Sequence, residues 1–427
     1  MTSELIIQGE QLIKKVESVD KFFGKYHVCP MKEVSSIHKS ISDIIPQITP
    51  VENPTNFDEV ISNEMKRRLC FEEFSLRTWL DSDYYNFQRV TQLYGIQQEE
   101  LDSLRPWLTK NRSLILDAIE RLYHSQEIKN TELKLPLDVP ELKRQAEEFS
   151  TLNIRKYHKV LGKLLERLTA IGGFLRDIDA VPTIEARSYF NLLTNTLAIG
   201  VPAICRFNSE GAIELNEMEL IQLYGHEGMG HALNRVATKN SSLPYFLKSD
   251  CHLNTSSAES IAQFYQNVIF DVLKESPNAQ KELNISHKFS EIYQDFLDVQ
   301  MLNEYNNHLF WYALTVLADK SLGSLDDPSS IKKKIELLTD VALTPSFPQC
   351  FVENHLRKFD SQGNLDYKMA SEIRYAAQPV KRVLSEFSNH GMNYAENRGL
   401  IDRTLLEGLW SPEGMLENAK RIIQNLD

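Results

Sequence analysis

Two histidines and a glutamate lie within six residues, in the stretch His226-Glu227-Gly228-Met229-Gly230-His231. Imidazole nitrogens bind zinc, and a carboxylate beside a zinc-bound water can act as a general base. The familiar zinc-peptidase motif is H-E-x-x-H, whose spacing puts both imidazoles on one face of a helix. Here the spacing is one residue longer, so an ideal helix turns through about 500° and leaves the imidazoles roughly 140° apart.

The two imidazoles can converge only if their helix contains an extra residue. One-turn π-bulges provide this and often occur at functional sites. Gly225, Gly228 and Gly230 surround the histidines, and each glycine in a helix interior costs about 1 kcal/mol relative to alanine. Because folding alone does not explain a burden of roughly 3 kcal/mol, we predict a local helix bulge at residues 228–230.

A catalytic zinc site requires three protein ligands and an open position for water. His226 and His231 supply two ligands, and Glu227 is placed to be the base. The next predicted helix opens at residues 254–259, and its first-turn carboxylate is Glu259. Two histidines and one glutamate form a known catalytic zinc set, so Glu259 is the candidate third ligand.

Other interpretations of this region stay open. Ser256 and Glu259 have the spacing of a capping box, which would explain the glutamate without a metal. His252, beside Cys251 in the preceding loop, is the rival ligand. Asp250 is a candidate carboxylate that orients an imidazole, or alternatively a helix or turn cap.

The composition is that of a globular protein, with 427 residues of which 42% are hydrophobic and 25% charged. A net charge of −12 argues against broad nucleic-acid binding, which requires a basic surface. There is no apolar run of about 18 residues and no signal-peptide pattern, so we expect no membrane partner. Five scattered cysteines indicate reduced thiols in a cytoplasmic protein.

Apolar residues at helical spacing predict a mainly α-helical fold with a cleft between two lobes. The clearest β signal is a hairpin in which residues 203–207 and 212–215 flank a turn, just before the helix that carries the histidines. A connector with two prolines at residues 130–140 suggests an N-terminal helical lobe at 1–135 and a catalytic region at 136–427. Helices are expected at 1–45, 57–80, 84–128 with a break near Pro106, 141–176, 216–236, 254–273, 289–322, 329–342, 347–359, 364–388 and after Ser411.

With these residues placed, the chain resembles the gluzincin metallopeptidases, in which a glutamate on the next helix completes the zinc shell. The expanded H-E-x-x-x-H spacing is found in dipeptidyl peptidase III and in the microtubule-associated tyrosine carboxypeptidases with their bacterial relatives. The second group is more similar, because a short hairpin precedes the motif helix and Leu243-Pro244 follows it. Glu259 also lies slightly under thirty residues beyond the motif, whereas the gap in dipeptidyl peptidase III is much longer.

A looser similarity links the chain to the Taq-type carboxypeptidases, which share Gly230-His231-Ala232-Leu233 but use the shorter H-E-x-x-H spacing. The double glutamate usual in the tyrosine carboxypeptidase group is Ala258-Glu259 here. The resemblance covers about residues 200–275.

The resemblance implies zinc-dependent hydrolysis of peptide bonds in a peptide or protein, by a carboxypeptidase in particular. Zn²⁺ would be held by His226, His231 and Glu259, with Glu227 as the base. The extended residues 201–207, with 212–215, would offer an edge strand to the substrate backbone.

Such an enzyme also needs a donor for the oxyanion and a cation for the terminal carboxylate. The candidate oxyanion donors are Tyr367, Tyr375, Tyr394 and His390. The candidate cations are Arg374, which is next to Tyr375, then Arg382 and Lys368. For each cation taken singly, a solvated helix face is the ordinary alternative.

Three further functions remain as alternatives. The same site would serve a zinc endopeptidase or aminopeptidase. A carboxylate-bridged di-iron oxygenase would need paired Glu-x-x-His motifs on two helices, and the sequence has none in the right form. A catalytically inactive helical interaction protein would retain the metal site without turnover.

Overall fold

The computed structural model describes residues 3–26, 30–81, 87–127, 138–168, 178–185, 187–191, 194–208, 210–249, 252–325, 327–356 and 371–426. Helices dominate these residues and strands form only two small sheets, which confirms the predicted mainly α fold. The helices of the N-terminal third are α1 (Ser3–Tyr26), α2 (Met31–Ile44), η1 (Ile45–Gln47), α3 (Phe57–Leu80), α4 (Phe87–Leu93) and α5 (Gln98–Glu127). The middle third contains α6 (Pro140–Leu168), α7 (Val201–Ile204), α8 (Glu217–Leu223), η4 (Tyr224–Ala232), α9 (Leu233–Asn240), η5 (Tyr245–Leu247), α10 (His252–Lys274) and α11 (Pro277–Leu283). The remainder comprises α12 (Phe289–Ala318), η6 (Lys320–Leu322), α13 (Pro328–Thr339), α14 (Phe347–Leu356), η7 (Ser371–Ala377), α16 (Pro379–Asn389), α17 (Tyr394–Leu406) and α18 (Pro412–Gln424).

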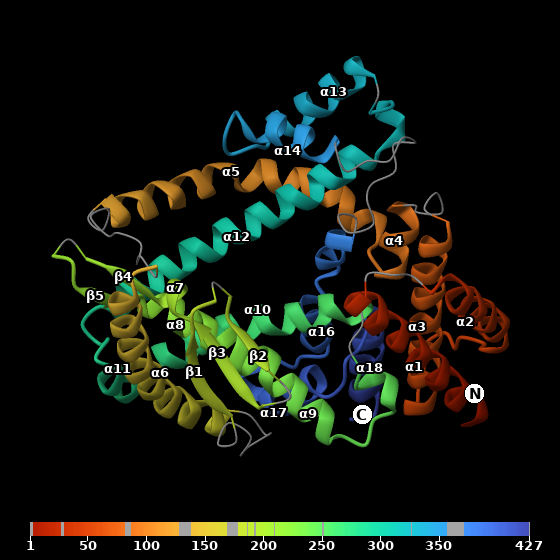
Figure 1. Ribbon diagram of the computed structural model, residues 1–427, viewed down its shortest axis with the longest axis horizontal. Helices are drawn as coiled ribbons and strands as arrows, with labels where there is room; N and C mark the ends of the chain where they lie inside the picture. The colour runs from red at the N-terminus through yellow and green to blue at the C-terminus, as the bar shows by residue number, and fades with distance from the viewer. Residues whose placement is uncertain are drawn as a thin grey trace.

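Two hydrophobic cores organise these helices. One core lies around α5, α12, α13 and α14, which form the upper layer in Figure 1, where α5 and α12 run side by side. The other joins α1, α2 and α3 to α6, α10 and α16–α18. Each core draws on residues from both sides of position 135. Most of the proline-containing connector lies outside the described residues, so the boundary at 135 remains a prediction.

The two small sheets precede the histidine motif in the chain. β3 (Thr196–Gly200) pairs in parallel with β1 (Asp179–Thr183) and antiparallel with β2 (Tyr189–Asn191), in the order β1-β3-β2. The predicted hairpin is confirmed as β4 (Cys205–Phe207) paired with β5 (Ile213–Leu215). The extended segment expected from residue 201 is wrong in its first half, because α7 occupies Val201–Ile204. Pro202 in its first turn fits a helix start, since proline needs no backbone partner there.

Two helix breaks differ from expectation, and both are set by backbone constraints. α5 is continuous through Pro106. Pro106 is exposed, so water can satisfy the carbonyl that loses its N–H partner. The break falls earlier, at Gly95, whose φ of +66° favours glycine.

The predicted helix at 364–388 is also interrupted. The described part consists of η7, then Gln378 with φ of +40°, then α16 starting at Pro379. A residue that precedes proline is disfavoured in the α conformation, which ends η7 at this point. Residues 357–370, including part of the predicted helix, lie outside the described residues.

The inner side of α10 is anchored by a buried carboxylate. Asp402 of α17 is fully buried and accepts hydrogen bonds from the hydroxyls of Tyr265, at 2.6 Å, and Tyr394, at 2.9 Å. Burial raises the pKa of Asp402, and the two hydroxyls oppose that rise. The ionised carboxylate therefore costs folding stability as the pH rises through its folded pKa.

Replacing Tyr265 by Phe removes one donor from this carboxylate and increases that cost. We expect the free energy of unfolding to fall by about 2 kcal/mol, with a larger defect at neutral pH than at acid pH. Urea unfolding at the two pH values measures this. Tyr293→Phe is the matched control, because the Tyr293 hydroxyl bonds Asp271 at an exposed site and its loss should cost less than about 0.5 kcal/mol. Equal losses in the two variants would contradict the anchoring role of Asp402.

Candidate metal centre

The two histidines lie on a helix whose middle is π-helical. α8 begins at an Asn216 cap, in which the side-chain oxygen accepts from the Glu219 N–H at 3.2 Å. The chain then passes through the π-helical η4, which covers Tyr224–Ala232, and continues as α9. The predicted bulge is confirmed and is wider than residues 228–230.

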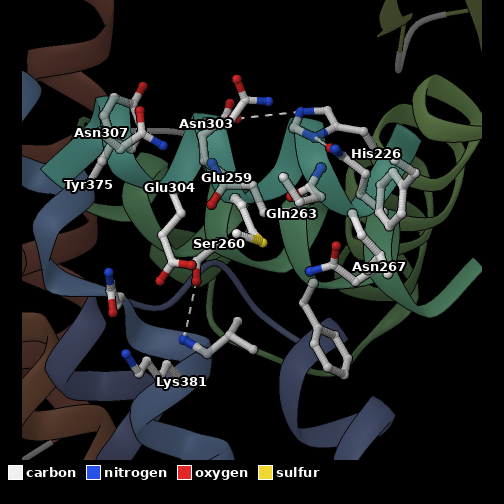
Figure 2. Close-up of a pocket in the computed structure, with 18 of the residues that line it drawn as sticks. His226, Glu259, Ser260, Gln263, Asn267, Asn303, Glu304, Asn307, Tyr375 and Lys381 are labelled. Atoms are coloured by element: carbon white, nitrogen blue, oxygen red, sulfur yellow. Dashed lines mark hydrogen bonds and ion pairs between the residues drawn. The ribbon is translucent and has the colours of Figure 1, made fainter. Parts of the chain in front are cut away.

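The π-helical turn brings the two imidazoles together. The ring centroids of His226 and His231 are 5.0 Å apart, with an interplanar angle of 82°. Each Nε2 is 3.5 Å from a different carboxylate oxygen of Glu259. One ligand atom from each of the three residues lies within 4.8 Å of the other two. Figure 2 shows Glu259 and His226 among the residues that line a neighbouring cavity.

Two glycines permit this convergence, because η4 and α10 pack along each other at very short range. A Cβ on Gly230 would lie 2.3 Å from the Cα of Ala262. A Cβ on Gly225 would lie 2.9 Å from the Cα of Gln266. Gly228 is different, since its Cβ would meet Leu197 at an ordinary 3.4 Å. The close approach of the two helices therefore depends on Gly225 and Gly230.

Glu259 does not cap its helix. α10 begins at His252, so Glu259 lies well inside the helix, and the expectation of a first-turn carboxylate was wrong. Capping is a property of the first turn, so it does not account for this residue. The contact of the Glu259 carboxylate with two imidazoles is the interaction that accounts for this residue instead.

Gln266 lies on the same face of α10 as Glu259, and it orients His226. The Gln266 side-chain oxygen lies 3.1 Å from His226 Nδ1, and it can only accept. Nδ1 therefore donates to Gln266, and Nε2 is the ring nitrogen that faces Glu259. Sequence reasoning did not single out Gln266, although its spacing of seven residues from Glu259 places both on one face of a helix.

The charges at the site are strongly coupled. Burial raises the pKa of Glu259, but hydrogen bonds and charge from His226 and His231 outweigh burial and hold that pKa well below its usual range. Burial lowers the pKa of His226, and the contact with Glu259 more than reverses this. Glu259 is thus an ionised, acceptor-only group between two nitrogen donors, which is the charge state that a metal ligand requires.

Glu227 lies next to His226, His231 and Glu259, and its carboxyl is influenced by burial and by these three residues. Burial raises the pKa of its carboxyl, against the lowering effects of His231 and His226. The backbone N–H of Phe190 also bonds this carboxylate. β2, which carries Phe190, packs against η4 and pairs with β3 along one side. Sequence analysis placed the edge strand at 201–207 and missed β2, whose three residues are too short for a periodic signal.

Of the remaining candidates, Tyr375 is at the cavity and Arg374 supports it. Tyr375 lines the cavity that contains Glu259. Arg374 Nη2 donates to the Tyr375 hydroxyl oxygen at 2.8 Å and lies 3.8 Å from Glu372. The described geometry thus directs the Arg374 guanidinium to Tyr375, and Arg374 itself is not among the residues that line this cavity.

The other candidates are held elsewhere or lie outside the described residues. Tyr394 donates to the buried Asp402. His390 bonds the Glu386 carbonyl at the exposed end of α16. Arg382 is bound by Glu100 and Glu413. Tyr367, Lys368, Asp250 and Cys251, together with the side chain of His252, lie outside the described part of the chain.

A cavity of about 1210 Å³ opens at the cluster of His226, His231 and Glu259. Its walls come from α10, α12, η7 and α16, with His226 and Glu259 in the lining (Figure 2). The cavity therefore lies between α10 and α12, and α12 contributes buried residues to both cores.

No family model, curated protein or solved structure matches the chain. None of the helices in the described ranges is long and apolar enough to cross a membrane.

Proposed function

We propose that the chain is a zinc-dependent peptidase, and in particular a carboxypeptidase. The observation that carries the proposal is the convergence of His226, His231 and Glu259, whose ligand-type atoms lie within 4.8 Å of one another. Glu227, a carboxylate with a raised pKa, lies directly beside them.

The residues fit zinc in distance and in chemistry. Zinc bonds nitrogen and oxygen at about 2.0–2.2 Å, so neighbouring ligand atoms of a tetrahedron are roughly 3.4 Å apart. The two separations between histidine nitrogen and glutamate oxygen are 3.5 Å. Two imidazoles and one carboxylate are a set that catalytic zinc uses. Gln266 would hold His226 in the tautomer that binds a metal through Nε2.

When bound, zinc polarises a peptide carbonyl and lowers the pKa of a coordinated water. Glu227 accepts a proton from the attacking water and returns it to the nitrogen of the leaving amine. The Tyr375 hydroxyl oxygen already accepts from Arg374. Its own proton is therefore free to be donated into the cavity, toward the developing oxyanion.

The choice of carboxypeptidase rests on the resemblance to the microtubule-associated tyrosine carboxypeptidase group. A cytoplasmic setting is part of the proposal, supported by the free thiols of the described Cys70, Cys205 and Cys350. The edge position of β2, beside Glu227, supports a peptide substrate, because an edge strand can pair with an extended backbone.

Metal analysis and product analysis together test the proposal. The purified chain should contain about one zinc per molecule, and His231→Ala should lose it. Mass spectrometry of a digested peptide should show removal of C-terminal residues. Release of N-terminal residues or internal fragments would replace the carboxypeptidase by an aminopeptidase or endopeptidase. Absence of zinc and of turnover would leave an interaction protein.

The orienting bond from Gln266 gives a further prediction. Gln266→Met keeps the size of this buried side chain and removes the acceptor for His226 Nδ1. We expect zinc affinity to fall about 10- to 100-fold, measured by competition with a chelator. Gln263→Met is the control, because Gln263 is an exposed neighbour on the same helix, and it should leave the affinity unchanged. Equal affinities in all three proteins would show that Gln266 does not position the ligand.

A further inference from the structure

We propose that the cavity beside the candidate metal centre binds an unfolded, non-acidic polypeptide segment through its main chain. This inference rests on the proposed peptidase function and specifies its substrate class. The cavity, at about 1210 Å³, exceeds the roughly 300–1,000 Å³ of an ordinary small-molecule pocket. It has room for several residues on one side of the scissile bond.

Side-chain amides dominate the polar lining of this cavity. α10 contributes Gln263 and Asn267, and α12 contributes Gln300, Asn303 and Asn307. Spacings of three and four residues place each set on one helix face. Two faces that bear amides thus line one cavity, and Figure 2 shows four of these side chains with Glu259.

These amides are free to bind a ligand. Within the described part of the chain, the side chains of Gln263, Asn267, Asn303 and Asn307 make no hydrogen bond, and all four are exposed. The side-chain nitrogen of Gln300 is buried and has no partner there. Because a buried donor without a partner is costly, Gln300 indicates a polar ligand that would supply an acceptor.

An amide is the side chain best matched to a peptide bond, because it carries both a carbonyl acceptor and N–H donors. It can therefore pair with the C=O and the N–H of the main chain, whereas a carboxylate only accepts and an ammonium only donates. Rows of amides accordingly bind a backbone whatever side chains it bears.

The charged residues of the cavity argue against an acidic segment. Arg121 is held by Asp298 through two bonds, at 2.9 and 2.6 Å. Lys381 is the other lysine or arginine in the lining, and Glu304 and Asp271 add negative charge there. A row of free cations, which an acidic peptide would need, is thus not present among the lining residues.

The test measures binding separately from cleavage, using the full-length Glu227→Gln chain and fluorescence anisotropy. The probes are a neutral unstructured ten-residue peptide, the same peptide with alternate backbone nitrogens methylated, a glutamate-rich peptide of that length, and a neutral oligosaccharide. Adding Asn303→Ala and Asn307→Ala should weaken binding of the neutral peptide about 10-fold, the loss expected for two neutral hydrogen bonds. Backbone methylation should cause a similar loss.

Asn153→Ala is the matched control, because Asn153 is a partly exposed helical amide on α6, outside the cavity. It should leave the peptide affinity unchanged. Circular dichroism checks that the exposed Asn303 and Asn307 substitutions preserve the fold, and Gln263→Ala with Asn267→Ala provides a second pair.

The main-chain inference is overturned if the methylated peptide binds as tightly as its parent, or if the glutamate-rich peptide or the oligosaccharide binds more tightly. Wild-type protein that hydrolyses peptides while the amide variants bind normally would overturn this inference alone. Main-chain binding by a chain without zinc or turnover would instead overturn the peptidase function.

Discussion

Glu227→Gln should lower peptide hydrolysis by at least about 10²-fold, and by up to about 10⁴-fold, while the protein retains zinc. The amide keeps the size of the side chain and cannot accept a proton from water. The three ligand-type residues, His226, His231 and Glu259, are unchanged, so metal content should remain near that of the wild type. Turnover of a chromogenic or mass-resolved peptide, together with metal analysis on the same sample, measures both effects.

Glu219→Gln is the matched control for this variant. Glu219 lies on α8, one element before η4, and burial raises the pKa of its carboxyl as it does for Glu227. Its contact with the helix cap uses the backbone N–H, which the substitution keeps. We therefore expect wild-type turnover from Glu219→Gln. A Glu227→Gln protein that retained a tenth or more of wild-type activity would remove Glu227 from the role of base.

The elements that sequence reasoning located best are those whose ends are fixed locally. α3 spans the predicted residues, and its start is fixed by Asn56 and Glu59, which form a reciprocal capping box there. Ser411 likewise caps α18, and its side chain accepts from the Gly414 N–H. Such capping signals depend on a few adjacent residues, so they can be recognised in the sequence without the tertiary fold.

The breaks that were misplaced depend on surroundings that the sequence does not display. Pro106 was expected to interrupt a helix, but its solvent exposure lets α5 continue. The sheet formed by β1, β2 and β3 was missed because its strands have only three to five residues, and β1 pairs in parallel with β3, beyond the intervening β2 in the chain. Short strands in a helical protein acquire their stability from tertiary packing rather than from a periodic pattern.

At the candidate metal centre, the sequence identified the residues and the structure shows why they converge. The spacing of His226 and His231 predicted an irregular helix, and η4 is π-helical. Glu259 had two explanations in the sequence, and the start of α10 at His252 removes the capping one. Gln266 could not be found in advance, because the role of an amide depends on which side chain faces it from another element.

Gly230→Ala is expected to damage both the fold and the site, because it forces two helices apart. Its Cβ would lie 2.3 Å from the Cα of Ala262, against 3.4 Å or more in an ordinary contact. That atom belongs to the backbone of α10, so η4 and α10 must separate by about 1 Å, a displacement that can lower turnover roughly 10²-fold. We expect the free energy of unfolding to fall by about 3 kcal/mol, with weakened zinc binding. Thermal unfolding and metal titration measure the two losses.

Gly228→Ala separates this effect from the general consequence of adding a methyl group to the same turn. Its Cβ would meet the Leu197 side chain at 3.4 Å, an ordinary contact. Alanine also favours a helix over glycine by up to about 1 kcal/mol, so the stability should be unchanged or slightly higher and zinc binding intact. If both variants lost stability and zinc binding to the same extent, glycine would be needed in η4 for its backbone freedom rather than for the approach of α10. A loss confined to Gly230→Ala would identify the close approach of the two helices as what holds Glu259 between His226 and His231.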